Sequence, residues 1–310
     1  MAAPSSVGSY AQGRAMSTPY PFTTLECQYR DLEQCIHKIE VATNTSTDRS
    51  PADGPCVLLY DVDEHSFDEI RKSDHPLLTS CTKFFDPNTK FLVLKMETLY
   101  HSSASMAVTR WIDQKAHDMN VGSELVFTGT GNYNLAQFDD NGLPEMSEGI
   151  LQTIQKRAEQ AIHPFAVPPS RTMKWPTFVL EVAYTEPRTK VERDMRLWLQ
   201  ATQSQVEFAM TASVDKWNKR ITLEQWELKH KPTKTNPDRI IADPVQKMCI
   251  AKPQSSSQNP TISGSFEIPF RSLFLRDCQG NEHDFVMTHE DITRLARDIW
   301  RVGTILSAQD

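Results

Sequence analysis

The stretch from Trp175 to Leu199 reads WPTFVLEVAYTEPRTKVERDMRLWL, and it decides the fold class expected for this chain. Within it, Phe178–Ala183 is apolar around a single carboxylate, Glu181, which predicts a central strand covered on both faces. After that strand the apolar residues take a helical spacing, at Val191, Met195, Trp198 and Leu199. We therefore expect a buried strand that leads into an amphipathic helix.

The segments around this block alternate between strand and helix patterns. Strands are predicted at 56–62, 90–96, 124–128, 133–138, 206–214, 220–228 and 266–270. Helices are predicted at 25–41, 101–119 and 150–162, and a terminal helix follows an N-cap at Thr288. Such interleaving favours an α/β fold with a mixed central sheet flanked by helices.

Two local expectations concern turns and loops. The strands at 124–128 and 133–138 flank the sequence GTGN, which predicts that they pair as a β-hairpin. Residues 229–260 are polar and rich in proline, so they predict mostly loop.

Composition limits the classes of protein to consider. The 310 residues carry a net charge of −7, so the whole-chain basic footprint of a nucleic-acid binder is missing and such binding would need a local basic patch or metal ions. None of the six cysteines forms a CxxC pair, and the N-terminus lacks a signal-peptide pattern. These features predict an intracellular protein with reduced thiols. No stretch approaches the roughly 20 apolar residues that span a membrane.

Domain organisation follows from the same pass along the chain. Residues 1–22 are rich in Ser, Ala, Gly and Pro, and residues 43–55 are polar with two prolines. We predict a flexible N-terminal arm and extension over 1–55 and a single α/β domain over 56–310.

The order of the predicted elements introduces a family resemblance. A helix at 101–118, strands at 124–128, 133–138 and 178–183, a helix at 190–200 and a strand at 206–214 follow one another. This αβββαβ order resembles the core of the restriction-endonuclease-like, or PD-(D/E)xK, phosphodiesterases. In that superfamily an Asp ends the second strand, and a carboxylate with a Lys two residues later occupies the third.

Several segments also resemble a group of nuclease-like proteins abundant in filamentous fungi. They are LVLKMETLYH (92–101), DDNGLP (139–144), WPTFVLEVAYTE (175–186), RDMRLWL (193–199) and ITLEQWEL (221–228). The resemblance covers roughly residues 90 to 302, and the block from WP to WL is its most specific part.

The resemblance implies a set of site residues. Asp139, or its neighbour Asp140, and Glu181 would hold Mg²⁺, which prefers oxygen ligands. The chain departs from the pattern at Ala183, where the family has its lysine, and Lys190 on the following helix is the nearest replacement.

Three further residues are weaker candidates. Arg188 and Arg193 are alternatives that could hold phosphate but not act as a base, and Asp113 could be an auxiliary ligand.

Two functions therefore remain open. One is a metal-dependent phosphodiesterase acting on nucleic acid, and the other is a catalytically inactive binding or interaction protein on the same fold. Each site residue also has an ordinary explanation. Glu181 could pair with an arginine, the DDNG sequence forms turns by itself, and Lys190 could be a surface charge.

Overall fold

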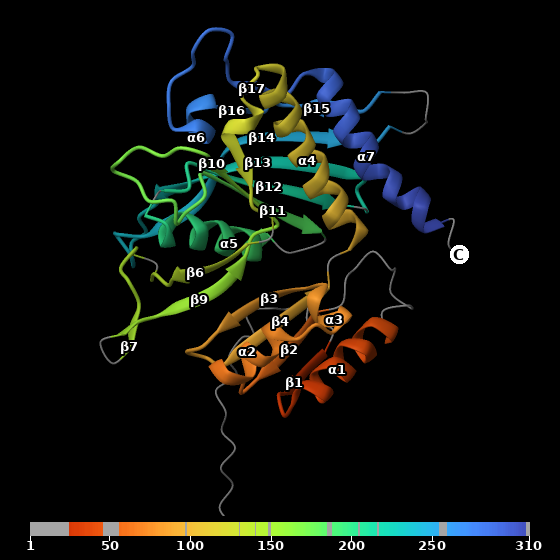
Figure 1. The fold of residues 1–310 in the computed structure, drawn as a ribbon, viewed down its shortest axis with the longest axis vertical. Helices are drawn as coiled ribbons and strands as arrows, with labels where there is room; N and C mark the ends of the chain where they lie inside the picture. Colours follow the sequence, from red (N-terminus) through yellow and green to blue (C-terminus); the bar gives the residue numbers. More distant parts are fainter. Residues whose placement is uncertain are drawn as a thin grey trace, which may run out of the picture.

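The protein is a mixed α/β structure built on two sheets (Figure 1). The structure is a computed structural model, and it describes residues 25–45, 56–96, 98–129, 131–139, 141–147, 150–184, 188–203, 205–215, 217–253 and 259–307. Within these residues no helix is long and apolar enough to cross a membrane.

A seven-stranded sheet forms the larger part of the molecule. Its strands lie in the order β15 (Thr261–Ser263), β14 (Ile240–Ala251), β13 (Arg220–His230), β12 (Phe208–Asp215), β11 (Phe178–Tyr184), β10 (Gln160–Pro164) and β5 (Leu125–Phe127). β11 and β12 are parallel, and every other neighbouring pair in this sheet is antiparallel.

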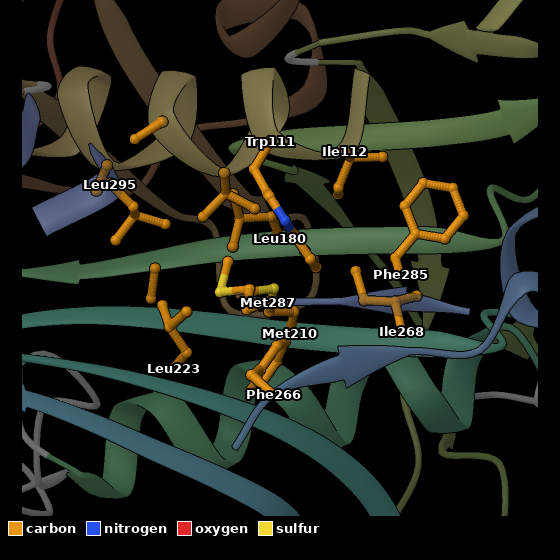
Figure 2. Close-up of a cluster of buried hydrophobic side chains, with 14 of the residues drawn as sticks. Trp111, Ile112, Leu180, Met210, Leu223, Phe266, Ile268, Phe285, Met287 and Leu295 are labelled. Atoms are coloured by element: carbon orange, nitrogen blue, oxygen red, sulfur yellow. The ribbon is translucent and has the colours of Figure 1, made fainter. Parts of the chain in front are cut away.

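Helices cover both faces of this sheet. One face packs against α4 (Leu99–Asp118) and α7 (His289–Ser307) in a large apolar cluster, shown in Figure 2. This cluster also takes in α6 (Phe270–Phe274) and the small sheet of β16 (Glu267–Ile268) and β17 (Phe285–Val286). The other face packs against α5 (Arg188–Ala201). A 3₁₀ turn, η2 (Gly122–Glu124), leads from α4 to β5.

A six-stranded sheet forms the second part. Its order is β1 (Leu25–Gln28), β2 (Cys56–Tyr60), β4 (Phe91–Met96), β3 (Cys81–Asp86), β9 (Thr153–Arg157) and β6 (Asn132–Ala136). Three helices pack on it: α1 (Leu32–Thr45), α2 (Glu64–Lys72) and α3 (Pro76–Thr79). A separate hairpin pairs β7 (Met146–Ser147) with β8 (Ile150–Leu151).

The central strand and the helix after it form as the sequence predicts. In β11, Leu180 and Val182 point into the cluster beneath α4, while Val179 and Ala183 point toward α5. Glu181 shares the α5 face because side chains alternate along a strand. The terminal helix also begins at the predicted N-cap, since the Thr288 hydroxyl accepts a hydrogen bond from the Asp291 amide at 3.2 Å.

The predicted hairpin over 124–138 is wrong. β5 pairs with β10 in the larger sheet, whereas β6 pairs with β9 in the smaller one. The turn sequence therefore carries the chain from one sheet to the other. Gly129 has a positive φ of 57°, which suits such a change of direction.

The predicted helix over 150–162 is also wrong, because this segment forms β8, β9 and β10. Along β9 the buried positions are Ile154 and Lys156, and the half-buried ones are Thr153, Gln155 and Arg157. This is a strand period of two, with a lysine in a position where an apolar residue is expected. Because Lys156 faces inward, the alternation of apolar and polar residues that indicates a strand is not visible in the sequence.

Two further segments differ from expectation. Residues 229–260 contain the twelve-residue strand β14 in place of mostly loop. Pro244 interrupts its apolar pattern, and the ladder shifts register at this point, opposite Gln225 and Trp226. The segment predicted as a helix from residue 25 begins with the strand β1. This strand pairs in parallel with β2, so the sheet includes residues on both sides of the boundary predicted between residues 55 and 56.

Truncating the central strand should destabilise the fold strongly. Leu180 is fully buried beneath α4, so Leu180→Ala should lower the free energy of unfolding by about 2–5 kcal/mol through lost burial and a cavity. Val126, which is 40% exposed on β5, provides a control whose change to alanine should cost about 0.5 kcal/mol. Chemical denaturation measures both, and equal losses would contradict the described core.

Candidate functional site

Five side chains meet on the α5 face of β11, and we call them the Glu181 cluster: Lys156, Glu181, Lys190, Asp194 and Trp198. The Lys156 Nζ lies 3.1 Å from Glu181 Oε1 and 3.2 Å from Asp194 Oδ2. The Trp198 Nε1 donates a hydrogen bond to the same oxygen of Glu181 at 2.6 Å. The Lys190 Nζ completes the group at 3.1 Å from Asp194 Oδ2.

Local structure explains how these residues meet. Lys190, Asp194 and Trp198 follow at intervals of four residues in α5, so they share one face of that helix. Glu181 stands at the middle of β11 and faces α5. Lys156 comes from β9, in the other sheet. The cluster therefore joins both sheets and the helix.

Burial makes the electrostatics of the cluster strong. The side chains of Lys156, Glu181 and Asp194 are only 8%, 13% and 11% exposed. Burial raises the pKa of Glu181; Lys156 opposes this shift and Asp194 adds to it. Burial acts to lower the pKa of Lys156, but Asp194 and Glu181 outweigh it and raise that pKa. The ammonium therefore stays charged at neutral pH.

Asp194 differs from Glu181 in its balance of charges. Burial acts to raise its pKa, but Lys156, Lys190 and Arg193 together lower it well below its usual range. Asp194 is thus the firmly ionised carboxylate of the cluster, placed to hold the Lys156 ammonium beside Glu181.

A second buried carboxylate lies further along the same face of the sheet. Cross-strand register aligns Glu181 with Thr211, then Glu224, then Lys247. Glu224 is 1% exposed, and its carboxylate lies 3.2 Å from the Lys247 Nζ and is hydrogen-bonded by Arg188. Polar groups thus cross the sheet beneath α5.

The predicted arginines have structural partners. The Arg188 guanidinium pairs with Glu224 and stacks over the Trp226 ring, 4.3 Å from its centroid. Arg193 lies over the ring of Phe84 at 5.7 Å. Arg188 thus serves the second buried carboxylate, whereas Arg193 acts on Asp194 through its charge.

Asp139 lies in a turn of its own. Its carboxylate accepts hydrogen bonds from the amides of Asn141 at 2.9 Å and Leu143 at 2.8 Å, and Gly142 in the same turn has a φ of 78°. Within the described residues no recorded contact joins Asp139 to Glu181, so their pairing as metal ligands stays a prediction. Asp140 lies outside the described residues.

The remaining candidates fall on either side of the sheet. Lys190 joins the Glu181 cluster through Asp194. Asp113 is half-exposed on α4 and lies 3.4 Å from the ring of His117. Since α4 packs on the opposite face of the sheet, Asp113 is on the other side from Glu181.

Sequence reasoning missed Lys156 and Asp194. The interval of four residues that links Lys190, Asp194 and Trp198 was available in the sequence and could have identified Asp194. Lys156 was hidden because its segment was interpreted as a helix, in which it would be one surface lysine among several charged residues.

A carboxylate-bearing residue also precedes β10. Gln160 pairs with Leu180 at the end of the β10–β11 ladder, and Glu159 is the half-buried residue immediately before it. The Glu159 carbonyl accepts a hydrogen bond from the Ser105 hydroxyl of α4 at 3.4 Å.

The oxygen atoms available here are suitable ligands for Mg²⁺, but they are too few to complete its coordination. Carboxylate oxygens of Glu159 and Glu181 are the type that Mg²⁺ prefers, and Mg²⁺ commonly uses one or two carboxylates with water and phosphate oxygens. Over the described part of the chain, no group of three His, Cys, Asp or Glu side chains gathers as a ready metal centre. Water and substrate would therefore have to complete the coordination.

No protein-family model matches this chain, and no curated protein sequence matches it.

Removing the central ammonium should destabilise the protein severely. Lys156→Met leaves two buried carboxylates without their shared partner, and breaking such a buried pair typically costs about 3–5 kcal/mol. Lys229, 42% exposed beside Glu227, is the matched control, and Lys229→Met should change stability by less than about 1 kcal/mol. Urea denaturation distinguishes the two, and a loss for Lys156→Met as small as that of the control would contradict the cluster.

Acid should destabilise the protein through Asp194. Because its pKa in the folded protein lies below the ordinary 3.8, its ionised form stabilises the fold above that pH, and this stability is lost as pH falls toward the folded-state pKa. The free energy of unfolding should therefore fall below about pH 4, and more steeply in the wild type than in Asp194→Asn.

The control for this pH series is Asp113→Asn, which removes a half-exposed carboxylate. It should leave the dependence of the unfolding free energy on pH below about pH 4 as it is in the wild type. Glu181 does not interfere with this measurement. Because its pKa is raised in the folded protein, it makes the free energy of unfolding fall as pH rises, and only above its ordinary pKa of 4.5. If the free energy of unfolding fell equally steeply with pH in the wild type and in Asp194→Asn, the ionised form of Asp194 would not be stabilising the fold.

Proposed function

We propose that this protein is a metal-dependent phosphodiesterase of the restriction-endonuclease-like type that acts on nucleic acid. The observation that carries the proposal is the position of the Lys156 ammonium, 3.1 Å from Glu181. The family motif places a lysine beside the third-strand carboxylate, and Ala183 stands where that lysine would be. Lys156 supplies the missing ammonium from a different strand.

The topology of the larger sheet supports the proposal. In chain order, α4, β5, β10, β11, α5 and β12 reproduce the αβββαβ sequence of elements. β5, β10, β11 and β12 are also neighbours in that order, with β11 and β12 parallel and β10 antiparallel to both of its neighbours. Under this proposal, β6, β7, β8 and β9 would belong to an insertion between the first and second core strands.

This topology changes the expected first ligand. The expectation for Asp139 rests on the predicted strand 133–138, and β6 in this segment pairs with β9 in the smaller sheet. The second core strand would be β10, and Glu159 is the carboxylate residue immediately before it, next to the Gln160–Leu180 pair. We therefore propose Glu159 and Glu181 as the residues that would hold Mg²⁺.

Each protein group would have a definite role. Lys156 is protonated, so it would stabilise negative charge on the phosphate and would not act as a base. The Trp198 N–H fixes one oxygen of Glu181, and Asp194 fixes the Lys156 ammonium. A bound Mg²⁺ would polarise the phosphate and lower the pKa of a water molecule.

One observation favours a second candidate function, a non-catalytic binding protein on the same fold. The Glu181 cluster holds two carboxylates and two ammonium groups, so its charges balance without a metal ion. A balanced and nearly buried cluster can serve structure alone.

Cleavage assays separate these functions. We expect the wild type to cleave DNA or RNA with Mg²⁺ or Mn²⁺, and Glu181→Gln, which keeps the shape of the side chain but removes its charge, to reduce the rate by at least about 100-fold. Glu159→Gln should also lose activity, whereas Asp139→Asn should not, and Glu290→Gln, at an exposed position of α7, is the neutral control.

The contrary results are equally defined. Full activity in Glu181→Gln would remove this mechanism, and loss in Asp139→Asn with activity in Glu159→Gln would restore Asp139 as the ligand. If the wild type neither cleaves nucleic acid nor shows Glu181-dependent heat on titration with Mg²⁺, the binding function is favoured.

A further inference from the structure

The turn between β12 and β13 presents an exposed aromatic ring at the end of the larger sheet. The Trp217 side chain in this turn is 74% exposed. Tryptophan is the largest aromatic side chain, and it is enriched at binding surfaces because it contributes much contact area at little cost in conformational entropy. Trp217 is therefore a candidate contact for a partner.

Hydrogen bonds hold this turn in one conformation. The Asp215 Oδ1 accepts bonds from the amides of Trp217 at 3.0 Å and Asn218 at 2.9 Å, and its Oδ2 accepts one from the Asn218 side chain at 2.6 Å. Lys219 has a positive φ of 50°, which turns the chain into β13. The backbone that carries the ring is thus preorganised, so binding would order little further chain.

Basic side chains lie beside the ring. Lys219 and Arg220 follow it in the turn, and both are exposed. Lys252, also exposed, joins them from the end of β14, because its amide donates a hydrogen bond to the Lys219 carbonyl at 2.8 Å. Among the described residues none of these three cations forms an ion pair with a carboxylate. Asp215 offsets part of their charge, and an excess of positive charge remains.

The terminal helix positions the third cation. The Lys252 Nζ lies 5.5 Å from the centroid of the Trp300 ring of α7. This contact orients the ammonium without neutralising it, since an aromatic ring carries no net charge. We call the four side chains of Trp217, Lys219, Arg220 and Lys252 the Trp217 patch.

The charge of the Trp217 patch differs from that of the chain. The whole chain carries a net charge of −7, so binding of nucleic acid needs a local basic patch or metal ions. The Trp217 patch combines positive charge with an exposed ring, and single-stranded nucleic acid offers the matching phosphates and unpaired bases. A membrane surface fits less well, because binding to it scales with the apolar area buried and one ring supplies little.

The Trp217 patch lies near the Glu181 cluster. Glu181 is level with Thr211 in the parallel pair of β11 and β12, and the turn begins four residues further, at Asp215. At about 3.3 Å per residue, this distance is about 13 Å along the strand. One bound strand is therefore long enough to contact both places.

We propose that the Trp217 patch binds single-stranded nucleic acid. The Trp217 indole stacks on an unpaired base, and Lys219, Arg220 and Lys252 contact phosphates. The choice of nucleic acid among anionic partners rests on the proposed function, and the Trp217 patch supplies a binding surface that the Glu181 cluster does not provide.

Fluorescence anisotropy tests the ring. A labelled oligothymidylate of about 12 nucleotides is titrated with the full chain in the presence of EDTA, so that no cleavage occurs. Trp217→Ala should weaken binding about tenfold, whereas Trp217→Phe should keep most of it because phenylalanine also stacks on bases. Phe165→Ala is the matched control: Phe165 is 73% exposed in the loop after β10, and its loss should leave binding unchanged.

The salt dependence of the same titration tests the charges. Lys219→Gln should lower the slope of log affinity against log salt concentration by about 0.7, the effect of one lost phosphate contact on a single strand. Lys72→Gln removes an equally charged side chain that is 68% exposed on α2, and it should keep the slope of the wild type.

Three results would overturn the proposal: no binding of the oligonucleotide by the wild type, equal affinities in Trp217→Ala and Phe165→Ala, or equal salt slopes in Lys219→Gln and Lys72→Gln. Trp217-dependent binding to vesicles of phosphatidylserine and phosphatidylcholine, without binding of the oligonucleotide, would also overturn it in favour of a membrane contact. Thermal melts establish that each variant is folded.

The two proposals fail in different ways. Glu181→Gln should bind the oligonucleotide in EDTA as the wild type does. Trp217-dependent binding without cleavage in Mg²⁺ would contradict the proposed function and support the Trp217 patch. Cleavage by a wild type whose binding does not depend on Trp217 would support the proposed function and contradict the Trp217 patch.

Discussion

The ion pair between Lys156 and Glu181 is the interaction on which the arrangement of the two sheets depends. Lys156 belongs to β9 in the six-stranded sheet, and Glu181 belongs to β11 in the seven-stranded one. The apolar cluster around it, which includes Leu135, Ile154 and Trp198, would accept small shifts in packing. Two buried opposite charges do not accept such shifts, since a displacement leaves each of them unpaired in a medium that penalises charge.

The same ion pair affects both the orientation and the charge of Glu181. A carboxylate that faces an ammonium and an indole N–H is held in one orientation, as catalysis requires. Those partners also neutralise it, and this weakens its attraction for a metal ion. A metal ion would therefore need a further oxygen ligand beside Glu181, and Glu159 is the residue proposed for that role.

The sequence predicts the central part of this fold well because that part obeys simple periods. Phe178–Ala183 is apolar on both faces, and the spacing of Val191, Met195 and Trp198 is helical. Tertiary structure overrides those periods elsewhere. Lys156 sits inward in a strand, and Pro244 sits within another strand at a shift in register. The residues near Lys156 and Pro244 in the sequence do not show that either lies within a strand, because the partners that stabilise each of them there are distant in sequence.

The candidate site could be predicted in part, since Glu181 and Lys190 both belong to the Glu181 cluster. Lys156 could not be found by counting along β11, because it belongs to a different strand. Ala183, two residues after Glu181, is buried in the apolar cluster that includes Val191, Met195 and Trp198 of α5, so a lysine there would place its ammonium among apolar side chains.

Ala183 lies on the α5 face of β11, and Asp194 of α5 shares the Lys156 ammonium with Glu181 on that face. The ammonium between those two carboxylates comes from β9, a strand of the smaller sheet. Under the proposed function, Lys156 would supply the ammonium that the family motif places two residues after its carboxylate, so position 183 would not need a lysine.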